Sequence, residues 1–220
     1  ATALLPAGHE VAKAQVVLAY DRSTQVAEQQ AASPLHLKST ASHWWVQWKA
    51  QEWGINRQTG LWEGFRVGQD LVLERALRPY FRRAPTDNDL GNLMPGRLAA
   101  WKVASERSQL LDLVLEAVDV ENVVIRAVLD LSGIAAVYTL TYRFRSSGQL
   151  SIEAHFQPKG EELPELPRFG RAWELPVHFD QLAWYGRGPH ENYVDRKTSA
   201  FIGRYRSSVA EQYHPYIRPQ

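Results

Sequence analysis

Alternation of apolar and polar side chains is the main pattern along this chain. Between residues 44 and 49 the sequence WWVQWK places an apolar side chain at every second position. Such a period of two predicts a β-strand with one face buried. Similar apolar segments, separated by short turn sequences that contain Gly, Asn or Ser, predict further strands at residues 35–38, 61–67, 71–74, 113–120, 123–131, 135–145, 150–157 and 181–185.

Only residues 97–108 have the spacing of an amphipathic helix, with Leu98, Trp101 and Val103 on the inward side. Strands that follow one another about every ten residues without intervening helices argue against parallel βαβ units. They favour a large antiparallel sandwich or barrel, so the fold class is predicted to be all-β. Four prolines within residues 158–180 restrict that stretch to edge strands or irregular loop.

The first residues are set apart from the rest by a polar stretch. Residues 8–20 are predicted to form one strand, and residues 21–34, which are rich in Ala and Gln, are predicted to be a linker. One strand cannot make a domain, so residues 1–20 are interpreted as the last strand of a preceding domain. The main domain is then 35–220. Because the chain starts at Ala1 without a signal peptide, we expect it to be a piece of a longer protein.

Composition excludes several classes of protein. Among 220 residues there are 24 Trp, Tyr and Phe side chains (8, 9 and 7), which is too much buriable surface for a disordered chain. The absence of Cys removes disulfide frameworks, thiolate catalysis and iron–sulfur clusters. Lys and Arg (25) balance Asp and Glu (24), so a nucleic-acid partner is not expected. No apolar run reaches the length of a membrane span, so no membrane partner is expected either.

The segment 82–92, RRAPTDNDLGN, is the first candidate site. Its Asp-x-Asp could offer oxygen ligands to Ca²⁺ or Mg²⁺, but the remaining positions of an EF-hand loop are not in register. The alternative is a network of turns in which the carboxylates cap backbone N–H groups and pair with Arg82 or Arg83. We favour this network.

The segment 184–196, WYGRGPHENYVDR, is the second candidate. Pro189 breaks the pattern of a dinucleotide-binding loop. Glu191 and Asp195 could be the two carboxylates of a glycosidase, but such pairs usually come from different elements of a scaffold. A structural ion-pair network with Arg196 is the interpretation that we favour. Elsewhere, no spacing of His, Ser or Asp indicates a zinc site or a catalytic triad. The tryptophans could pack in the core or present flat faces to a sugar.

Taken together, these segments resemble a known family. The motifs at 82–89, 167–170 (PRFG), 184–196 and 213–220 (YHPYIRPQ) are similar, in order and spacing, to those of the C-terminal small-chain domain, domain 5, of bacterial β-galactosidases of glycoside hydrolase family 2. The resemblance covers residues 35–220. Residues 7–12, AGHEVA, also resemble the end of the immunoglobulin-like domain that precedes it in that family.

The resemblance implies a β-supersandwich of the galactose-mutarotase type, truncated here at its C-terminus. In the whole family enzyme, two glutamates of a central (β/α)₈ barrel hydrolyse terminal β-D-galactosides with retention, helped by Mg²⁺ and Na⁺ held in that barrel. None of those groups falls in this segment, so no catalytic residue, cofactor or metal ligand is expected in it. The expected partners are the barrel and immunoglobulin-like domains of the same chain, a β-galactoside substrate and further copies in a homo-oligomer, in the bacterial cytoplasm.

The segment is therefore expected to shape the active-site entrance and to support assembly. Two alternatives stay open: a carbohydrate-binding module with a saccharide on the sandwich face, and a mutarotase-like sugar epimerase. The candidate residues of the substrate entrance or domain interface are Arg83, Asp87, Asn88, Asp89, Arg168, His190, Glu191, Asn192, Tyr193, Asp195 and Arg196.

Overall fold

The computed structural model describes residues 4–16, 18, 32–160 and 163–214. The chain divides into two compact units. The larger unit comprises residues 27–177 and 218–220, and the smaller unit comprises residues 1–26 and 178–217.

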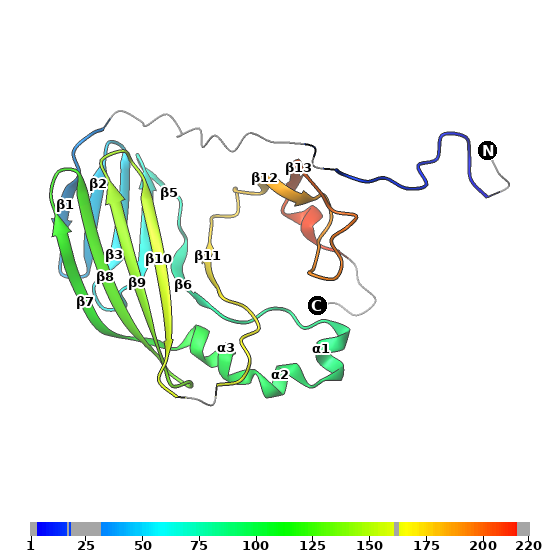
Figure 1. The fold of residues 1–220 in the computed structure, drawn as a ribbon. Coiled ribbons are helices and arrows are strands. Elements are labelled where there is room, and N and C mark those ends of the chain that lie inside the picture. Colours follow the sequence, from blue (N-terminus) through cyan, green and yellow to red (C-terminus); the bar gives the residue numbers. More distant parts are fainter. Residues whose placement is uncertain (1–3, 17, 19–31, 161–162, 215–220) are drawn as a thin grey trace. The chain divides into compact units, whose positions relative to one another are not determined.

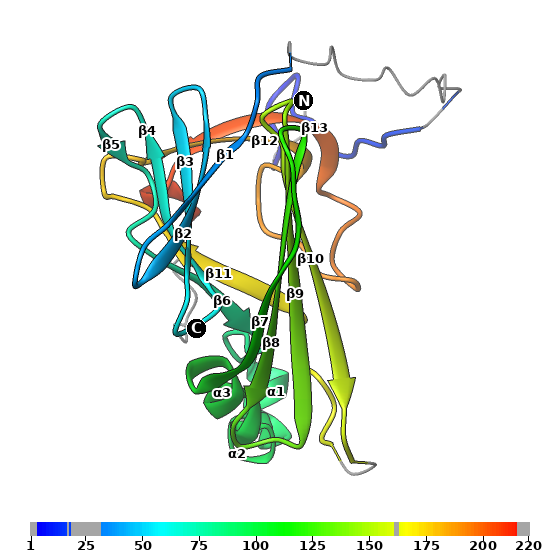
Figure 2. The same ribbon diagram turned by 90° about the vertical axis from the view of Figure 1, so that its left-hand side faces the viewer.

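Two antiparallel sheets form the body of the larger unit, and they face one another (Figures 1 and 2). The first has the strand order β1-β2-β3-β4-β5, with β1 His36–Ser39, β2 His43–Trp48, β3 Gln51–Asn56, β4 Trp62–Val67 and β5 Asp70–Leu71. The second has the order β10-β9-β8-β7, with β7 Ser108–Val118, β8 Asn122–Leu131, β9 Ala136–Arg145 and β10 Leu150–Pro158. Every strand pairs with its neighbour in sequence, as in a meander.

The hydrophobic core lies between these two sheets. On β9 every second side chain is buried, which is the period of two that the sequence shows. The largest fully buried side chains of the second sheet are Ile125, Leu129, Leu131, Tyr138, Leu140, Tyr142 and Phe144. They pack in one cluster with Val46, Trp48, Trp53 and Ile55 of the first sheet. The all-β sandwich predicted from the sequence is confirmed.

A third strand pair and three short helices complete the larger unit. Strand β6, Arg75–Tyr80, pairs with β11, Gly170–Glu174. Helices α1 Asp87–Gly91, α2 Met94–Arg97 and α3 Ala99–Glu106 lie at one end of the sandwich (Figure 1). The predicted helix 97–108 is thus confirmed with shorter bounds, and Trp101 is buried on α3. Ser105 links α3 to the end of β6, because its hydroxyl accepts from the Phe81 N–H at 2.9 Å.

The smaller unit is a hairpin with a long connecting loop. Strand β12, Gln181–Gly188, pairs along its whole length with β13, Phe201–Ser208, and a 3₁₀ turn follows at Ala210–Gln212. Among its described residues, Ala200 is the only buried apolar side chain. The side-chain amide of Gln15 bonds to both main-chain groups of Ile202, at 2.8 and 2.7 Å. The N-terminal segment thus lies along the outer edge of β13.

Some expectations about individual elements were wrong. Residues 8–20 were expected to be one strand, but residues 8–16 and 18 have no strand conformation, and residues 17, 19 and 20 lie outside the described residues. A strand needs a main-chain partner, and here a Gln15 side chain makes the contact instead. The linker 21–34 lies almost wholly outside the described residues. Assignment of residues 1–20 to a preceding immunoglobulin-like domain stays a prediction. No helix in the described part of the chain is long and apolar enough to cross a membrane.

Candidate functional site

Asp89 is the centre of the first motif segment, residues 82–92. Its carboxylate accepts from the Arg83 guanidinium through both oxygens, with Arg83 Nη2 at 2.9 Å from Oδ1 and Nη1 on Oδ2. The same carboxylate accepts from the Thr86 N–H at 2.8 Å and the Thr86 hydroxyl at 2.9 Å. Asp89 is 8% exposed. The predicted pairing with Arg83 is confirmed.

The local sequence explains this geometry. Thr86 and Asp89 are three residues apart and form a capping box that starts helix α1. The expectation of a loop of Asx turns was wrong in this respect, because residues 87–91 are helical. The Thr-x-x-Asp spacing before Leu90 was the signal that could have predicted the helix start.

Hydrogen bonds from Arg83 hold the pKa of the Asp89 carboxyl below its usual value, against the opposing effect of burial. An ionised carboxylate whose oxygens are already engaged is not suited to donate a proton. Its accepted bonds also leave little room for a metal ligand. Within the described residues, no three Asp, Glu or His side chains come together as a metal site. Asp89 therefore fixes the segment rather than performing chemistry.

Asp87 and Asn88 behave differently from Asp89. Both are exposed on the first turn of α1. Neither side chain makes a hydrogen bond or ion pair with another described residue. Arg168, in the PRFG motif before β11, is also exposed, and its guanidinium lies 5.9 Å from the centre of the Tyr80 ring.

The second motif segment, residues 184–196, runs from the last residues of β12 into the connection between β12 and β13. Arg187 closes this connection, because its Nη1 donates to the main-chain oxygens of Lys197 at 3.0 Å and Ala200 at 2.9 Å. Tyr193 and Arg196 exchange two main-chain bonds, at 3.1 and 3.2 Å. The sequence did not single out Arg187, because its partners are carbonyls that any residue supplies.

Glu191 and Arg196 form an ion pair, and the Arg196 guanidinium lies 5.5 Å from the centre of the Tyr193 ring. His190 Nδ1 donates to the carbonyl of Glu191 at 2.7 Å. The predicted pairing of Glu191 is confirmed. The predicted pairing of Asp195 was wrong: this side chain is exposed, and no described residue bonds to it. The same is true of the Asn192 side chain.

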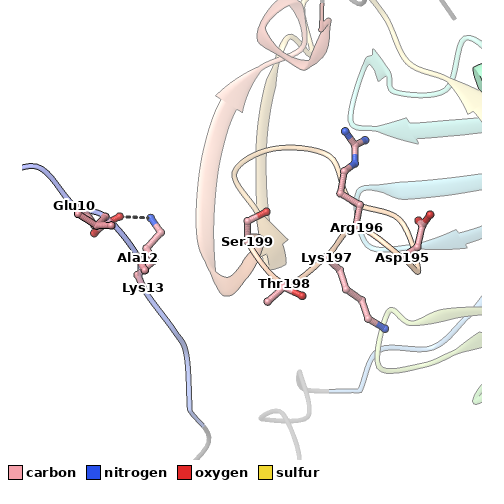
Figure 3. A pocket seen from close by; sticks show the side chains of 9 residues that line it. Glu10, Ala12, Lys13, Asp195, Arg196, Lys197, Thr198 and Ser199 are labelled. Atoms are coloured by element: carbon pink, nitrogen blue, oxygen red, sulfur yellow. Dashed lines mark ion pairs between the residues drawn. The ribbon is translucent and has the colours of Figure 1, made fainter. Parts of the chain in front are cut away.

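Figure 3 shows the surroundings of Asp195, where residues 195–199 and residues 10–13 line a pocket of about 510 Å³. Arg196 and Lys197 extend from the loop in opposite directions, and Glu10 is paired with Lys13 at 3.3 Å. A glycosidase acid needs an apolar environment to remain protonated. Glu191 and Asp195 are both exposed, so this loop lacks such an environment.

The tryptophans of the first sheet pack against other side chains rather than presenting a free ring face to solvent. Trp48 and Trp53 are 4% and 3% exposed, and Trp44 and Trp62 pack against the core cluster. Trp45 lies on the outer face of the sheet, stacked on His43 at 5.4 Å, with Arg66 at 5.2 Å from its ring centre. These contacts occupy the ring faces that a sugar would stack on.

The two motif segments fall in different units: Arg83, Asp87, Asn88, Asp89 and Arg168 belong to the larger unit, and residues 190–196 belong to the smaller one. Each segment thus contains one arginine–carboxylate pair and exposed polar side chains, such as Asp87 and Asp195, that bond to no other described residue. The candidate residues therefore fall into two kinds in each segment: those that form the ion pair and those that are exposed outside it.

Comparison with known proteins places these segments in a family. Residues 47–220 match the family described as beta galactosidase small chain. A β-galactosidase of Priestia megaterium is 37% identical over 76% of this chain and 16% of its own length. A β-galactosidase of Vibrio cholerae is 36% identical over 77% of this chain and 18% of its own length. One from Streptococcus thermophilus is 29% identical over 100% of the chain and 21% of its own length. The chain thus spans about a fifth of the length of these relatives.

Proposed function

Because the chain belongs to the β-galactosidase small chain family, we propose that it works as a non-catalytic part of a β-galactosidase, where it shapes the active-site entrance and supports assembly. The observation that carries this proposal is the state of the motif carboxylates. Asp89 and Glu191 are each held by an arginine of their own segment, as in a structural ion pair. Hydrolysis of terminal β-D-galactosides, with retention, then belongs to the rest of the enzyme.

In this proposal the exposed motif residues Asp87, Asn88, Asn192 and Asp195 complete their hydrogen bonds with other parts of the enzyme. Polar side chains without internal partners are well suited to the rim of a domain interface. The Mg²⁺ and Na⁺ of the enzyme would be held by its barrel, and an immunoglobulin-like domain would precede this one. Assembly as a homo-oligomer and a cytoplasmic location complete the proposal.

A hydrolysis assay tests the non-catalytic role. The 220-residue chain, purified alone, should release no nitrophenol from 4-nitrophenyl β-D-galactoside, whereas the complete enzyme should. Turnover by the chain that disappears in the Glu191→Gln variant would contradict the proposal. Titration with lactose, followed by Trp fluorescence, tests the carbohydrate-binding alternative. That alternative requires a saturable change in fluorescence as lactose is added.

The interface role is tested by substitutions in the complete enzyme. Asp87→Ala and Asp195→Ala should lower its melting temperature or its assembly, while the pH profile of turnover stays unchanged. Glu153→Ala is the matched control, since Glu153 is exposed on β10 outside the motifs. In the isolated chain all three variants should have the melting temperature of the parent, because none of these side chains bonds to another residue in the part of the chain that the structure describes. A shifted pH profile with an unchanged melting temperature would instead assign the carboxylate to catalysis.

A further inference from the structure

A second pocket, which the proposed function does not use, lies where the helices meet the end of β6. Its volume is about 360 Å³, within the range of small-molecule sites. Residues from the β6–α1 connection, from α2 and α3, and from the segment before β11 line it. All of them belong to the larger unit.

The floor of this pocket is apolar and fixed. Met94 and Leu98, both 7% exposed, belong to the hydrophobic core, and three prolines contribute to the walls. Side chains held in a packed core keep their positions without a ligand. The pocket is therefore preformed, with an apolar floor that does not collapse when no ligand is bound.

The rim of the pocket is cationic. Arg82, Arg83 and Lys102 line it, and no carboxylate does. Arg83 is neutralised by Asp89, as described above. Arg82 and Lys102 are exposed, and neither makes an ion pair or side-chain hydrogen bond with another described residue. Two uncompensated positive charges thus stand beside an apolar floor.

We propose that this pocket binds a small organic anion that carries a carboxylate on an apolar body, with the body on Met94 and Leu98 and the carboxylate between Arg82 and Lys102. An apolar body gains from leaving water, and the two cations select a negative head group. A free sugar fits less well, since the floor offers no hydrogen-bonding side chain. A bare phosphate would leave the floor unused. This proposal holds whether or not the chain works within a β-galactosidase.

The experiment uses 4-phenylbutyrate as the probe, its uncharged amide as the matched neutral compound, and inorganic phosphate as the anion without an apolar body. Binding to the 220-residue chain is measured by isothermal titration calorimetry and by ligand-observed NMR. We expect saturable binding of 4-phenylbutyrate, and weaker or no binding of the amide and of phosphate.

Variants then locate the site. Arg82→Gln and Lys102→Gln should each weaken binding of 4-phenylbutyrate by about twofold to fivefold, which is typical for one exposed ion pair. Ala99→Trp, at an exposed position of the pocket lining, should fill the pocket and abolish binding. Lys38→Gln removes one exposed positive charge on β1 and should leave the affinity unchanged. Circular dichroism confirms that each variant is folded.

Three results would overturn the proposal. The first is no saturable binding of 4-phenylbutyrate. The second is equal binding of the acid and the amide, which would remove the role of the cations. The third is unchanged binding by Ala99→Trp in a folded variant, because the anion would then bind elsewhere.

Discussion

Two buried tyrosines in the core differ in the hydrogen bonding of their hydroxyl groups. The Tyr142 hydroxyl donates to the carbonyl of Gly60 at 3.1 Å. The Tyr138 hydroxyl is buried and bonds to no other described residue. Burial raises the pKa of Tyr138 to about 12, and it also raises the pKa of Tyr142. Both rings therefore stay neutral at physiological pH, and the two hydroxyls can be compared directly.

Substitution by phenylalanine should separate the two positions. Tyr142→Phe should lower the free energy of unfolding by about 1 kcal/mol, because it leaves the Gly60 carbonyl without its donor. Tyr138→Phe removes a buried hydroxyl for which the described residues offer no partner, so it should leave stability unchanged or raise it. Urea denaturation of the two variants beside the parent measures the difference. Equal losses would contradict the hydrogen-bond assignment.

Asp89 should make the stability of the chain depend on pH in acid. The folded-state pKa of Asp89 lies below its ordinary value. The contribution of the carboxylate to folding stability is therefore complete above the unfolded-state pKa, near 4. It is lost as the pH falls through the lower folded-state pKa. Asp89→Asn should lower stability by about 1–2 kcal/mol at pH 7. The difference from the parent should shrink below pH 4. Asp87→Asn is the control, because Asp87 lies on the same helix turn but its side chain bonds to no other described residue. It should change stability by less than about 0.5 kcal/mol. Thermal melts between pH 3 and 7 provide the measurement.

At the scale of elements, the first sheet depends on a contact between one ring and two glycines. Trp45, Gly54 and Gly64 are direct neighbours across β2, β3 and β4. A Cβ at Gly54 would lie 2.7 Å from the Trp45 ring, and one at Gly64 would lie 2.5 Å from it. The absence of these two side chains creates the flat surface on which the ring rests.

Gly64→Ala should therefore destabilise the chain by about 1–3 kcal/mol through overpacking. The cost should be smaller in a Trp45→Ala background, since the clash is with that ring. Gly96→Ala is the control, because nothing lies within 4 Å of its Cβ position and the residue is helical. Chemical denaturation of the four variants completes the cycle. A cost for Gly64→Ala that is independent of Trp45 would show that backbone conformation, not the ring, is limiting.

The elements that the sequence predicted are those with a regular period. Strand β9 alternates along its whole length and β8 alternates from Ile125 to Leu131, and their buried side chains match that pattern. Strand β3 was not among the predicted strands, because Gln51, Glu52 and Gly54 interrupt its apolar pattern. Strand β6 was missed because of Pro79, which is tolerated since β6 pairs with β11 alone. Strand β13 was not among the predicted strands. Its pairing with β12 joins residues that are 13 to 27 positions apart in the sequence, which local pattern does not reveal.

Prediction of the candidate site was limited for a related reason. The Arg83–Asp89 and Glu191–Arg196 pairs join residues close in sequence, and charge pattern alone indicated them. Arg187 bonds to carbonyls, and the cation-rimmed pocket of Arg82 and Lys102 requires three separate segments. Contacts of these kinds appear only after the chain has folded.

At the scale of the whole molecule, the two units differ in what they bury. The larger unit has an extensive core between its sheets, whereas Ala200 is the only buried apolar side chain among the described residues of the smaller unit. Hydrogen-bonded strands without a core are held mainly by their ladder, and local opening of such regions is inexpensive.

Hydrogen exchange should report this difference. Amides of β8 and β9 should exchange only through global unfolding, whereas those of β12 and β13 should exchange at least about 100-fold faster, which corresponds to a difference of roughly 2.7 kcal/mol in opening free energy. Mass spectrometry of peptic fragments measures both regions in one sample. Equal protection would mean that the smaller unit is stabilised by contacts other than a core of its own.

The ring of Trp45 on its two glycines also has a consequence for how the family can change over time. An alanine at 54 or 64 should be harmful while the indole is present, and loss of the indole should expose the glycine backbone that the ring covers. Each single step is therefore disfavoured, although a combined change is tolerable. Positions 45, 54 and 64 should therefore covary in related sequences. Where either glycine is replaced by a residue with a side chain, a residue smaller than Trp should stand at position 45.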